Sequence, residues 1–332
     1  RRRRHFAPVT AGFSPLTPIL IDITRLVYRR LSHTLPTGID RVSIEYLRHY
    51  GGRARAVLGF GPFSAVMSAA DSARLFRAVA DPASPAGLLL LTAIAKAILW
   101  RWLALDVAGS FLFNTGHVGL ENRFHAWALR WRGARPIVVV HDLIPITHPE
   151  YCRPGERARH VARMTCAARI SAGVVANSHH TLEVLTGFCR EHRLPMPPAI
   201  VARLAHGLPS LPPGPRPLAA PYFVILGTIE PRKNHWMLLQ LWRRLVDAHG
   251  DRAPRLVVIG QRGWECENVV DLLERCQQLQ GIVIEHSRCT DAELVTWLHH
   301  AQALLFASFA EGYGLPVAEA LSLGVPVIAS EL

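Results

Sequence analysis

The stretch ALLFASFAEGYGLPVAEALSLGVPVIAS, residues 303–330, alternates between two kinds of regular structure. ALLFAS is a short apolar run typical of a buried strand, a helix is predicted from Pro316, and PVIAS is a second apolar run. Gly324 and Pro326 end the helix, because glycine is favoured just past a helix and proline cannot continue one. A strand, a helix and a strand in this order predict a parallel sheet.

The same alternation occupies both halves of the chain. Strands are predicted at residues 18–22, 54–58, 111–114, 136–142 and 172–178, and again at 222–226, 255–260, 281–285, 303–308 and 326–330. Helices are predicted after Gly38, Glu121, Gly155 and Ser178, and from Asn234, whose side chain can cap a helix through His249. Short apolar strands between helices are typical of parallel sheets buried on both faces. We therefore predict an α/β protein with two parallel-sheet domains.

Charge and composition change near one proline-rich stretch, LPSLPPGPRPLAAP at 208–221. Residues 1–216 carry 28 Lys and Arg against 12 Asp and Glu, whereas residues 217–332 carry 9 against 13. This stretch is predicted to be a linker between domains. The predicted domains are residues 1–210 and 222–332, joined by a linker at 211–221.

The composition excludes several classes of protein. No segment reaches the roughly 18 uninterrupted apolar residues of a membrane span. The nearest, Ala86 to Leu105, contains Lys96 and Arg101 and is predicted to be a buried helix or a membrane-surface patch. The six cysteines show no C-x-x-C pair, and no apolar signal segment follows the basic start, which favours a cytoplasmic setting. The basic half could face an anionic membrane or a phosphorylated substrate; no zinc-finger or RNA-binding signature supports nucleic acid.

EGYGLPVAEA, residues 311–320, is predicted to be a strand-to-helix turn at the carboxyl edge of a sheet. Ligands of such sheets bind at that edge. Backbone N–H groups at the helix start, with the helix dipole behind them, suit a phosphate. These groups belong to Gly312, Tyr313, Gly314 and Leu315. The carboxylates of Glu311 and Glu319 would repel phosphate, and we interpret them as acceptors for sugar hydroxyls; the alternative is a solvated loop.

LGTIEPRKNH, residues 226–235, also follows a strand and precedes a helix. Arg232 and Lys233 would therefore lie at a strand's carboxyl end, where arginine presents a fork to phosphate and lysine a point charge. The chain has 35 arginines and only two lysines, so a lysine here indicates a specific need. The alternative is a solvated pair at a helix start.

Together with VVVHDLIPITHPEYCRPG (138–155) and PTGIDRV (36–42), these motifs resemble those of a known enzyme family. The chain resembles the retaining glycosyltransferases of family 4, which have two facing Rossmann-like domains with parallel sheets, the GT-B fold. HDLIP and GTIEPRKNH are similar to stretches of mannosyltransferases of polysaccharide assembly. The resemblance covers residues 18 to 332, while the region between Gly59 and Ser110 matches no named element.

The resemblance implies roles for individual residues. Glu311 would contact the donor sugar, Glu319 the ribose, and His141 the donor sugar near its reacting carbon. Lys233, Arg232 and the loop from Gly312 to Leu315 would bind the diphosphate. At Gly38 the backbone would approach donor and acceptor. Several family members carry arginine directly after the strand's glycine, where this chain has Thr228, so the diphosphate contacts at Thr228 and Arg232 stay open.

The implied reaction moves a sugar from a nucleotide-diphosphate donor to a glycan or lipid-linked acceptor, with the second domain holding the donor. GDP-mannose is the donor we favour, although base and sugar stay open. No cofactor and no metal are expected, because the chain contains no D-x-D. It also contains no P-loop, no nicotinamide-type G-x-G-x-x-G and no G-x-S-x-G.

Other readings of the same motifs remain. An epimerase or phosphorylase could use the same fold, and a non-catalytic scaffold at a membrane surface could retain it. We expect a cytoplasmic protein in peripheral contact with an anionic inner membrane face. Because the alternation calls for another loop and helix after PVIAS, we also expect the second domain to be incomplete at Leu332.

Overall fold

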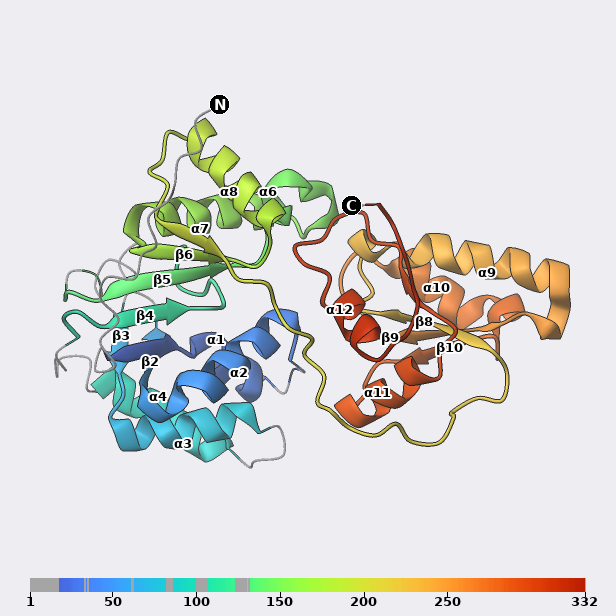
Figure 1. The fold of residues 1–332 in the computed structure, drawn as a ribbon, viewed down its shortest axis with the longest axis horizontal. Helices are drawn as coiled ribbons and strands as arrows, with labels where there is room; N and C mark the ends of the chain where they lie inside the picture. The colour runs from blue at the N-terminus through green and yellow to red at the C-terminus, as the bar shows by residue number, and fades with distance from the viewer. Residues whose placement is uncertain are drawn as a thin grey trace. The chain divides into compact units, whose positions relative to one another are not determined.

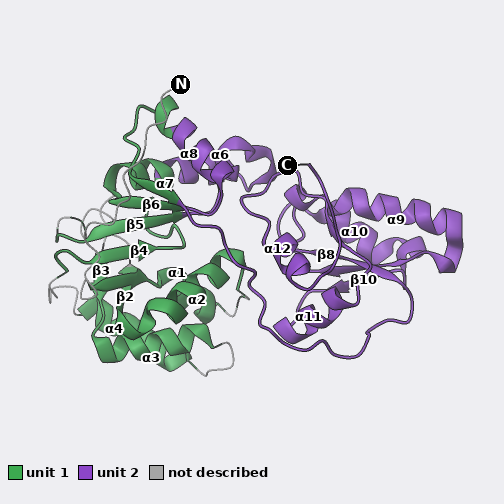
Figure 2. Ribbon diagram, viewed as in Figure 1, with its two compact units in different colours: residues 1–139, 163–175, 189–200 green, residues 140–162, 176–188, 201–332 purple. Residues whose placement is uncertain are grey.

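The computed structural model describes residues 18–32, 34, 36–60, 63–81, 86–99, 107–122, 130 and 132–331. The chain divides into two compact units, shown in two colours in Figure 2. The first contains residues 1–139, 163–175 and 189–200, and the second contains residues 140–162, 176–188 and 201–332. Two short segments of the first half therefore group with the second half. The domain boundaries inferred from the sequence stay a prediction.

The first sheet has, among the described residues, seven strands in the order β3-β2-β1-β4-β5-β6-β7 (Figure 1). Their bounds are β1 (Ile19–Asp22), β2 (Ala54–Phe60), β3 (Phe63–Val66), β4 (Phe111–Asn114), β5 (Arg135–Val140), β6 (Gly173–Ala176) and β7 (Ala199–Val201). The five predicted strands are present. Strand β3 was not predicted, and it pairs antiparallel with β2. Only two residues separate these strands, too few for the crossover that a parallel pair needs.

The second sheet has the order β10-β9-β8-β11-β12, and its strands pair in parallel. The bounds are β8 (Tyr222–Leu226), β9 (Arg255–Ile259), β10 (Val283–His286), β11 (Leu304–Phe306) and β12 (Val327–Ala329). All five were predicted; β8 has its predicted bounds, and the ends of the other four differ by at most two residues. The fold class predicted from the alternation, α/β with parallel-dominated sheets, is confirmed.

Alternate residues of the second sheet fill two cores. In β9, Leu256 and Val258 pack on one face, whereas Val257 and Ile259 pack on the other. The helices of this unit that supply the partners are α9 (His235–His249) and α10 (Glu267–Arg275) on the first face, and α11 (Asp291–His299) and α12 (Leu315–Ser322) on the second. Because successive side chains of a strand point to opposite faces, a continuous apolar run is required in a sheet covered on both sides.

The remaining helices come from residues 24–191. They are α1 (Thr24–Leu31), α2 (Gly38–Tyr50), α3 (Ala69–Ala80), α4 (Gly87–Leu99), α6 (Ile144–Thr147), α7 (Glu156–Ile170) and α8 (His179–Glu191). Helices α3 and α4 occupy the region that the sequence left unassigned. The helix predicted after Glu121 falls largely outside the described residues. No helix in the described ranges combines the length and apolar character needed to cross a membrane.

The helix starts test the predicted caps. The Ser178 hydroxyl accepts the backbone N–H of Thr181 at 3.0 Å and caps α8, the helix predicted to follow Ser178. Asn234 precedes α9 but does not cap it with its side chain, so that prediction is wrong. Its backbone is left-handed, with φ 57°, and its side-chain amide lies 3.6 Å from the sulfur of Met237 instead. Helix α12 begins at Leu315, one residue before Pro316.

Candidate functional site

Two loops meet at the carboxyl edge of the second sheet. Strand β8 lies between β9 and β11. The chain continues from β8 to β9 and β10 on one side, and it later adds β11 and β12 on the other side of β8. Such a switch in strand order is where α/β sheets bind ligands. The loop after β8 carries GTIEPRKN and the loop after β11 carries AEGYG. Pairing of Leu304 with Val224 sets these loops side by side.

A single carboxylate oxygen joins the two loops. Glu311 Oε1 lies 2.5 Å from Lys233 Nζ and 2.7 Å from a terminal nitrogen of Arg232. The three side chains are 13%, 10% and 18% exposed respectively, so little water screens these ion pairs. The two cations and the first glutamate predicted from separate motifs therefore form one cluster.

Arg232 is held on several sides. Its guanidinium donates twice to Glu230 Oε1, at 3.0 and 2.6 Å, and once to the carbonyl of Ala310 at 2.8 Å. Its own carbonyl accepts the N–H of Phe309 at 2.9 Å. Arg232 thus fixes the spacing of the two loops. Glu230, which is 5% exposed, was not singled out from the sequence, although an acid directly before P-R-K was a visible signal.

Burial and neighbouring charges shift the pKa values of these groups in opposite directions. Burial lowers the pKa of Lys233 below its ordinary value, against the attraction of Glu311. Burial alone would raise the pKa of Glu311, but Lys233 and Arg232 outweigh it and hold that pKa below its usual range. Burial raises the pKa of Glu230 despite the neighbouring Arg232. The cluster therefore keeps an ionised Glu311 between two cations at neutral pH.

Gly227 leaves room for the lysine. Its φ is +147°, and a Cβ there would lie 3.1 Å from Cε of Lys233. The next residue, Thr228, points its methyl group toward the loop after β9, where a Cβ on Gly263 would lie 2.7 Å from it. Thr228 is therefore packed on a neighbouring loop. Its predicted place among the donor-binding residues stays a prediction.

The EGYG loop is seated on the turn that follows β5. A Cβ on Gly312 would lie 2.3 Å from the carbonyl oxygen of His141, so only glycine fits. The same carbonyl accepts the side-chain amide of Asn177 at 2.7 Å. The carbonyl of Gly312 accepts the hydroxyl of Ser178 at 3.0 Å. His141, which is buried, and the loop of Glu311 are thus brought together, and Asn177 and Ser178 are positioning residues that the sequence did not reveal in this role.

Helix α12 begins directly after the EGYG loop. Gly314 precedes the helix with φ +84° and accepts the N–H of Val317 at 2.9 Å. The first backbone N–H groups of a helix have no acceptor within it, so they are available to a ligand. Tyr313 donates its hydroxyl to the carbonyl of Leu204, and Glu319 lies buried at the fifth position of the helix. Leu315 is the first helical residue.

Gly38 belongs to the first compact unit, whereas the other predicted site residues belong to the second. It is the first residue of α2, behind Thr37. Asp40 in that turn is 1% exposed and lies 2.7 Å from both Arg25 and Arg29. The turn around Gly38 is therefore a rigid helix start. Its predicted contact with donor and acceptor stays a prediction.

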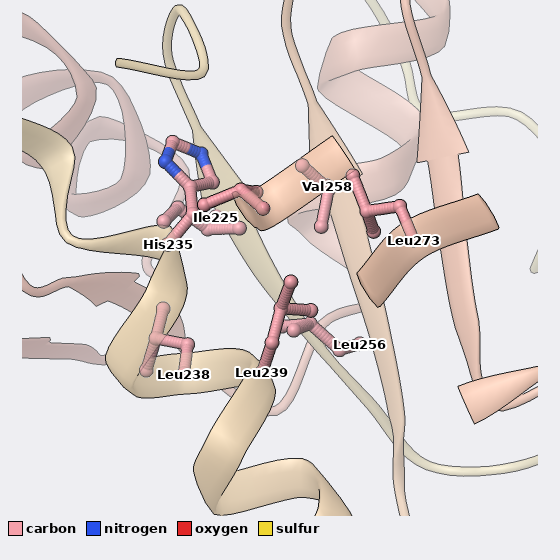
Figure 3. Close-up of a pocket in the computed structure, with 8 residues that line it drawn as sticks. Ile225, His235, Leu238, Leu239, Leu256, Val258 and Leu273 are labelled. Atoms are coloured by element: carbon pink, nitrogen blue, oxygen red, sulfur yellow. The ribbon is translucent and has the colours of Figure 1, made fainter. Parts of the chain in front are cut away.

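A small apolar cavity lies under α9 (Figure 3). It is lined by apolar side chains of β8, β9, α9 and α10, together with His235, and has no room for a water molecule. It belongs to the core and holds no ligand site. Among the described residues, no group of three His, Cys, Asp or Glu side chains is placed to hold a metal ion.

The chain is similar to known glycosyltransferases in sequence. Residues 220–332 match the family described as glycosyl transferases group 1. Serotype-specific mannosyltransferase WbdA of Escherichia coli is 29% identical over 238 residues, which is 66% of this chain and 28% of that protein. O-antigen chain mannosyltransferase B of Escherichia coli is 29% identical over 240 residues, 64% of this chain and 61% of that protein. The chain thus spans under a third of WbdA.

Solved structures resemble the fold over nearly the whole chain. Anabaena HepE in complex with UDP has a TM-score of 0.60 at 16% identity, covering 95% of this chain and 80% of that one. Sucrose-phosphate synthase from Thermosynechococcus elongatus has a TM-score of 0.61 at 14% identity, covering 95% and 82%. At these identities the likeness concerns the fold alone.

Proposed function

We infer that this protein is a retaining sugar transferase, on the premise that its residues 220–332 belong to the family of glycosyl transferases group 1. The family resemblance noted in the sequence is confirmed, and the fold is that of the GT-B neighbours. The activity itself is proposed from the cluster of Lys233, Arg232 and Glu311 beside the start of α12. That cluster is the observation that carries the proposal.

The two cations and the helix start suit the diphosphate of a nucleotide donor. When the bond from the sugar to the diphosphate breaks, negative charge grows on the departing phosphate oxygens. Preorganised positive groups stabilise such charge most when water is excluded. An ammonium has three N–H donors, so Lys233 can hold Glu311 and a phosphate oxygen together. The backbone N–H groups of Gly314 and Leu315 would donate hydrogen bonds to the other phosphate oxygens.

The two glutamates would bind the sugar groups of the donor. Glu311, ionised between its cations, would accept hydroxyl groups of the transferred sugar. Glu319 would accept those of the ribose. His141, whose backbone is fixed against Gly312, would contact the donor sugar near its reacting carbon. These three roles follow the motif resemblance.

We propose GDP-mannose as the donor and a glycan or lipid-linked sugar as the acceptor, in the assembly of a polysaccharide. Support comes from the relatives named mannosyltransferases. We also propose that positive charge on the protein replaces a metal ion in stabilising the diphosphate. The protein would work in the cytoplasm, in peripheral contact with an anionic membrane.

Isothermal titration with GDP, UDP and ADP tests the proposal first. We expect GDP to bind more tightly than UDP or ADP. We also expect Lys233→Ala to weaken the binding of the diphosphate more than that of the nucleoside. Binding of none would favour a non-catalytic scaffold and overturn the proposal. Product analysis with GDP-mannose and an acceptor then separates transfer from epimerisation or phosphorolysis, and the anomeric configuration of the product tests retention.

A further inference from the structure

Helix α4 is apolar on two opposite faces. Leu90, Ala93 and Ala97 are buried in the core of the first unit. On the other face Leu88 is 77% exposed, Leu91 56%, Ile98 48% and Leu99 73%. The buried face explains why the helix packs on the sheet. It does not explain why four large apolar side chains are exposed to solvent.

The exposed residues form one stripe. Each helical residue turns the chain by about 100°, so positions 88, 91, 98 and 99 fall within about 100° of arc. Lys96 lies off this stripe, and its ammonium is 3.2 Å from Asp71 of α3. The stripe is therefore continuous along the helix and uncharged. Such a stripe exceeds the scattered apolar residues of an ordinary surface.

The two helices that pack against α4 are rich in basic residues. Helices α1 and α3 both contact α4 and each other. The three helices carry one acidic residue, Asp71, and six basic residues: Arg25, Arg29, Arg30, Arg74, Arg77 and Lys96. Asp40 of α2 neutralises part of the charge on α1, whereas Arg74 and Arg77 are exposed on α3. The apolar stripe thus lies on a helix whose two packed neighbours, α1 and α3, carry net positive charge.

We propose that this face of α4 docks on an anionic lipid surface. Its leucines and isoleucine would enter the boundary between headgroups and acyl chains, while Arg74 and Arg77 contact lipid phosphates. A helix of thirteen residues is about 20 Å long, too short to span a bilayer but suited to lie in its surface.

A second copy of the chain fits this face less well. In a symmetric dimer the same patch meets itself, so the exposed arginines of both copies would be brought together and repel. The proposal names the surface for the membrane contact proposed above. It depends on neither donor nor acceptor, so its test and that of the transferase activity can fail separately.

Vesicle co-sedimentation of the full chain tests the proposal. We expect binding to vesicles of phosphatidylglycerol and phosphatidylcholine, weaker binding to phosphatidylcholine alone, and loss of binding as salt rises. Leu91→Asp should lower binding to the anionic vesicles at least tenfold. Leu241→Asp is the matched control, since Leu241 of α9 is 44% exposed in the second unit. It should bind vesicles like the unchanged protein.

Two further measurements keep the outcome decisive. The double variant Arg74→Glu, Arg77→Glu changes exposed side chains alone and should lower binding to anionic vesicles but not the melting temperature. It also serves if Leu91→Asp does not fold. Vesicle binding that is unchanged in both variants would overturn the proposal, as would no vesicle binding at all. A concentration-dependent dimer that Leu91→Asp abolishes, without lipid binding, would assign the face to a second copy.

Discussion

Lys233 and Glu311 are 78 residues apart in the chain, yet Nζ of one lies 2.5 Å from Oε1 of the other. The contact exists because β8 and β11 are neighbours in the sheet and both loops leave at the same edge. It places a buried positive charge where the start of α12 already favours an anion. The ion pair therefore fixes the position of the lysine, as the proposed binding of a diphosphate requires.

Lys233→Ala should lower kcat by about 10²–10³, because one preorganised charge partner of the transition state is lost. The nucleoside should bind almost as before. Arg244→Ala removes the same charge from the outer surface of α9 and should leave kcat unchanged. Steady-state rates with the donor identified by titration check both variants. A Lys233→Ala enzyme of near-normal turnover would contradict the assigned role.

Gly312→Ala should displace the EGYG loop, since its new methyl group would lie 2.3 Å from the backbone oxygen of His141. Overpacking against backbone costs about 1–3 kcal/mol of unfolding free energy, and the donor KM should rise. Gly187→Ala on α8 is the control, because nothing lies within 4 Å of the added Cβ. It should stabilise the protein by up to about 1 kcal/mol in urea unfolding. Equal stability losses in the two variants would argue against the close contact.

His235 should make the protein sensitive to mild acid. It is 3% exposed, and within the described part of the chain neither ring nitrogen has a hydrogen-bond partner. Burial, assisted by Lys233, lowers the pKa of His235 from 6.5 to about 4. Between these values the unfolded chain binds a proton that the folded protein does not, so stability falls as pH falls. One such group contributes a loss of about 2 kcal/mol between pH 7 and pH 5.

His235→Leu removes this titration. The variant should unfold with a free energy that changes about 2 kcal/mol less over the same pH interval. It should also be at least as stable at pH 7, because buried polar atoms without partners are replaced by apolar ones. Urea unfolding at pH 7, 6 and 5 measures both effects. Parallel pH profiles for the two proteins would show that His235 is protonated equally in the folded and unfolded states.

Turnover should survive removal of divalent metal ions. The reason is the cationic pair of Arg232 and Lys233, which supplies the positive charge that a metal ion would otherwise bring to the diphosphate. Initial rates with and without excess EDTA, followed by addition of magnesium or manganese, provide the measurement. Loss of activity in EDTA with rescue by either ion would overturn the proposed stabilisation.

The structural features that the sequence did not predict have a common physical cause. Strands β3 and β7 are three or four residues long, and neither stands between two helices, so the alternation did not reveal them. Helix α4 was predicted only as one of two alternatives for the stretch Ala86 to Leu105, because apolar residues on both faces remove the periodicity that indicates orientation. Asn234 looked like a cap, yet its left-handed backbone directs the side chain to Met237. Each case depends on neighbours that are not local in sequence.

The sequence by itself determined the α/β class, the strands of both sheets that alternate with helices, and the two loops that carry the candidate site. Those features depend on residues within a few positions of one another, so periodicity and turn residues are sufficient to predict them. Only the tertiary structure decided that Glu311 pairs with Lys233 and Arg232, that Glu230 is buried behind them, and that Gly312 rests on the carbonyl of His141. Strand order sets these contacts, and it follows from packing over the whole sheet, which no local pattern records.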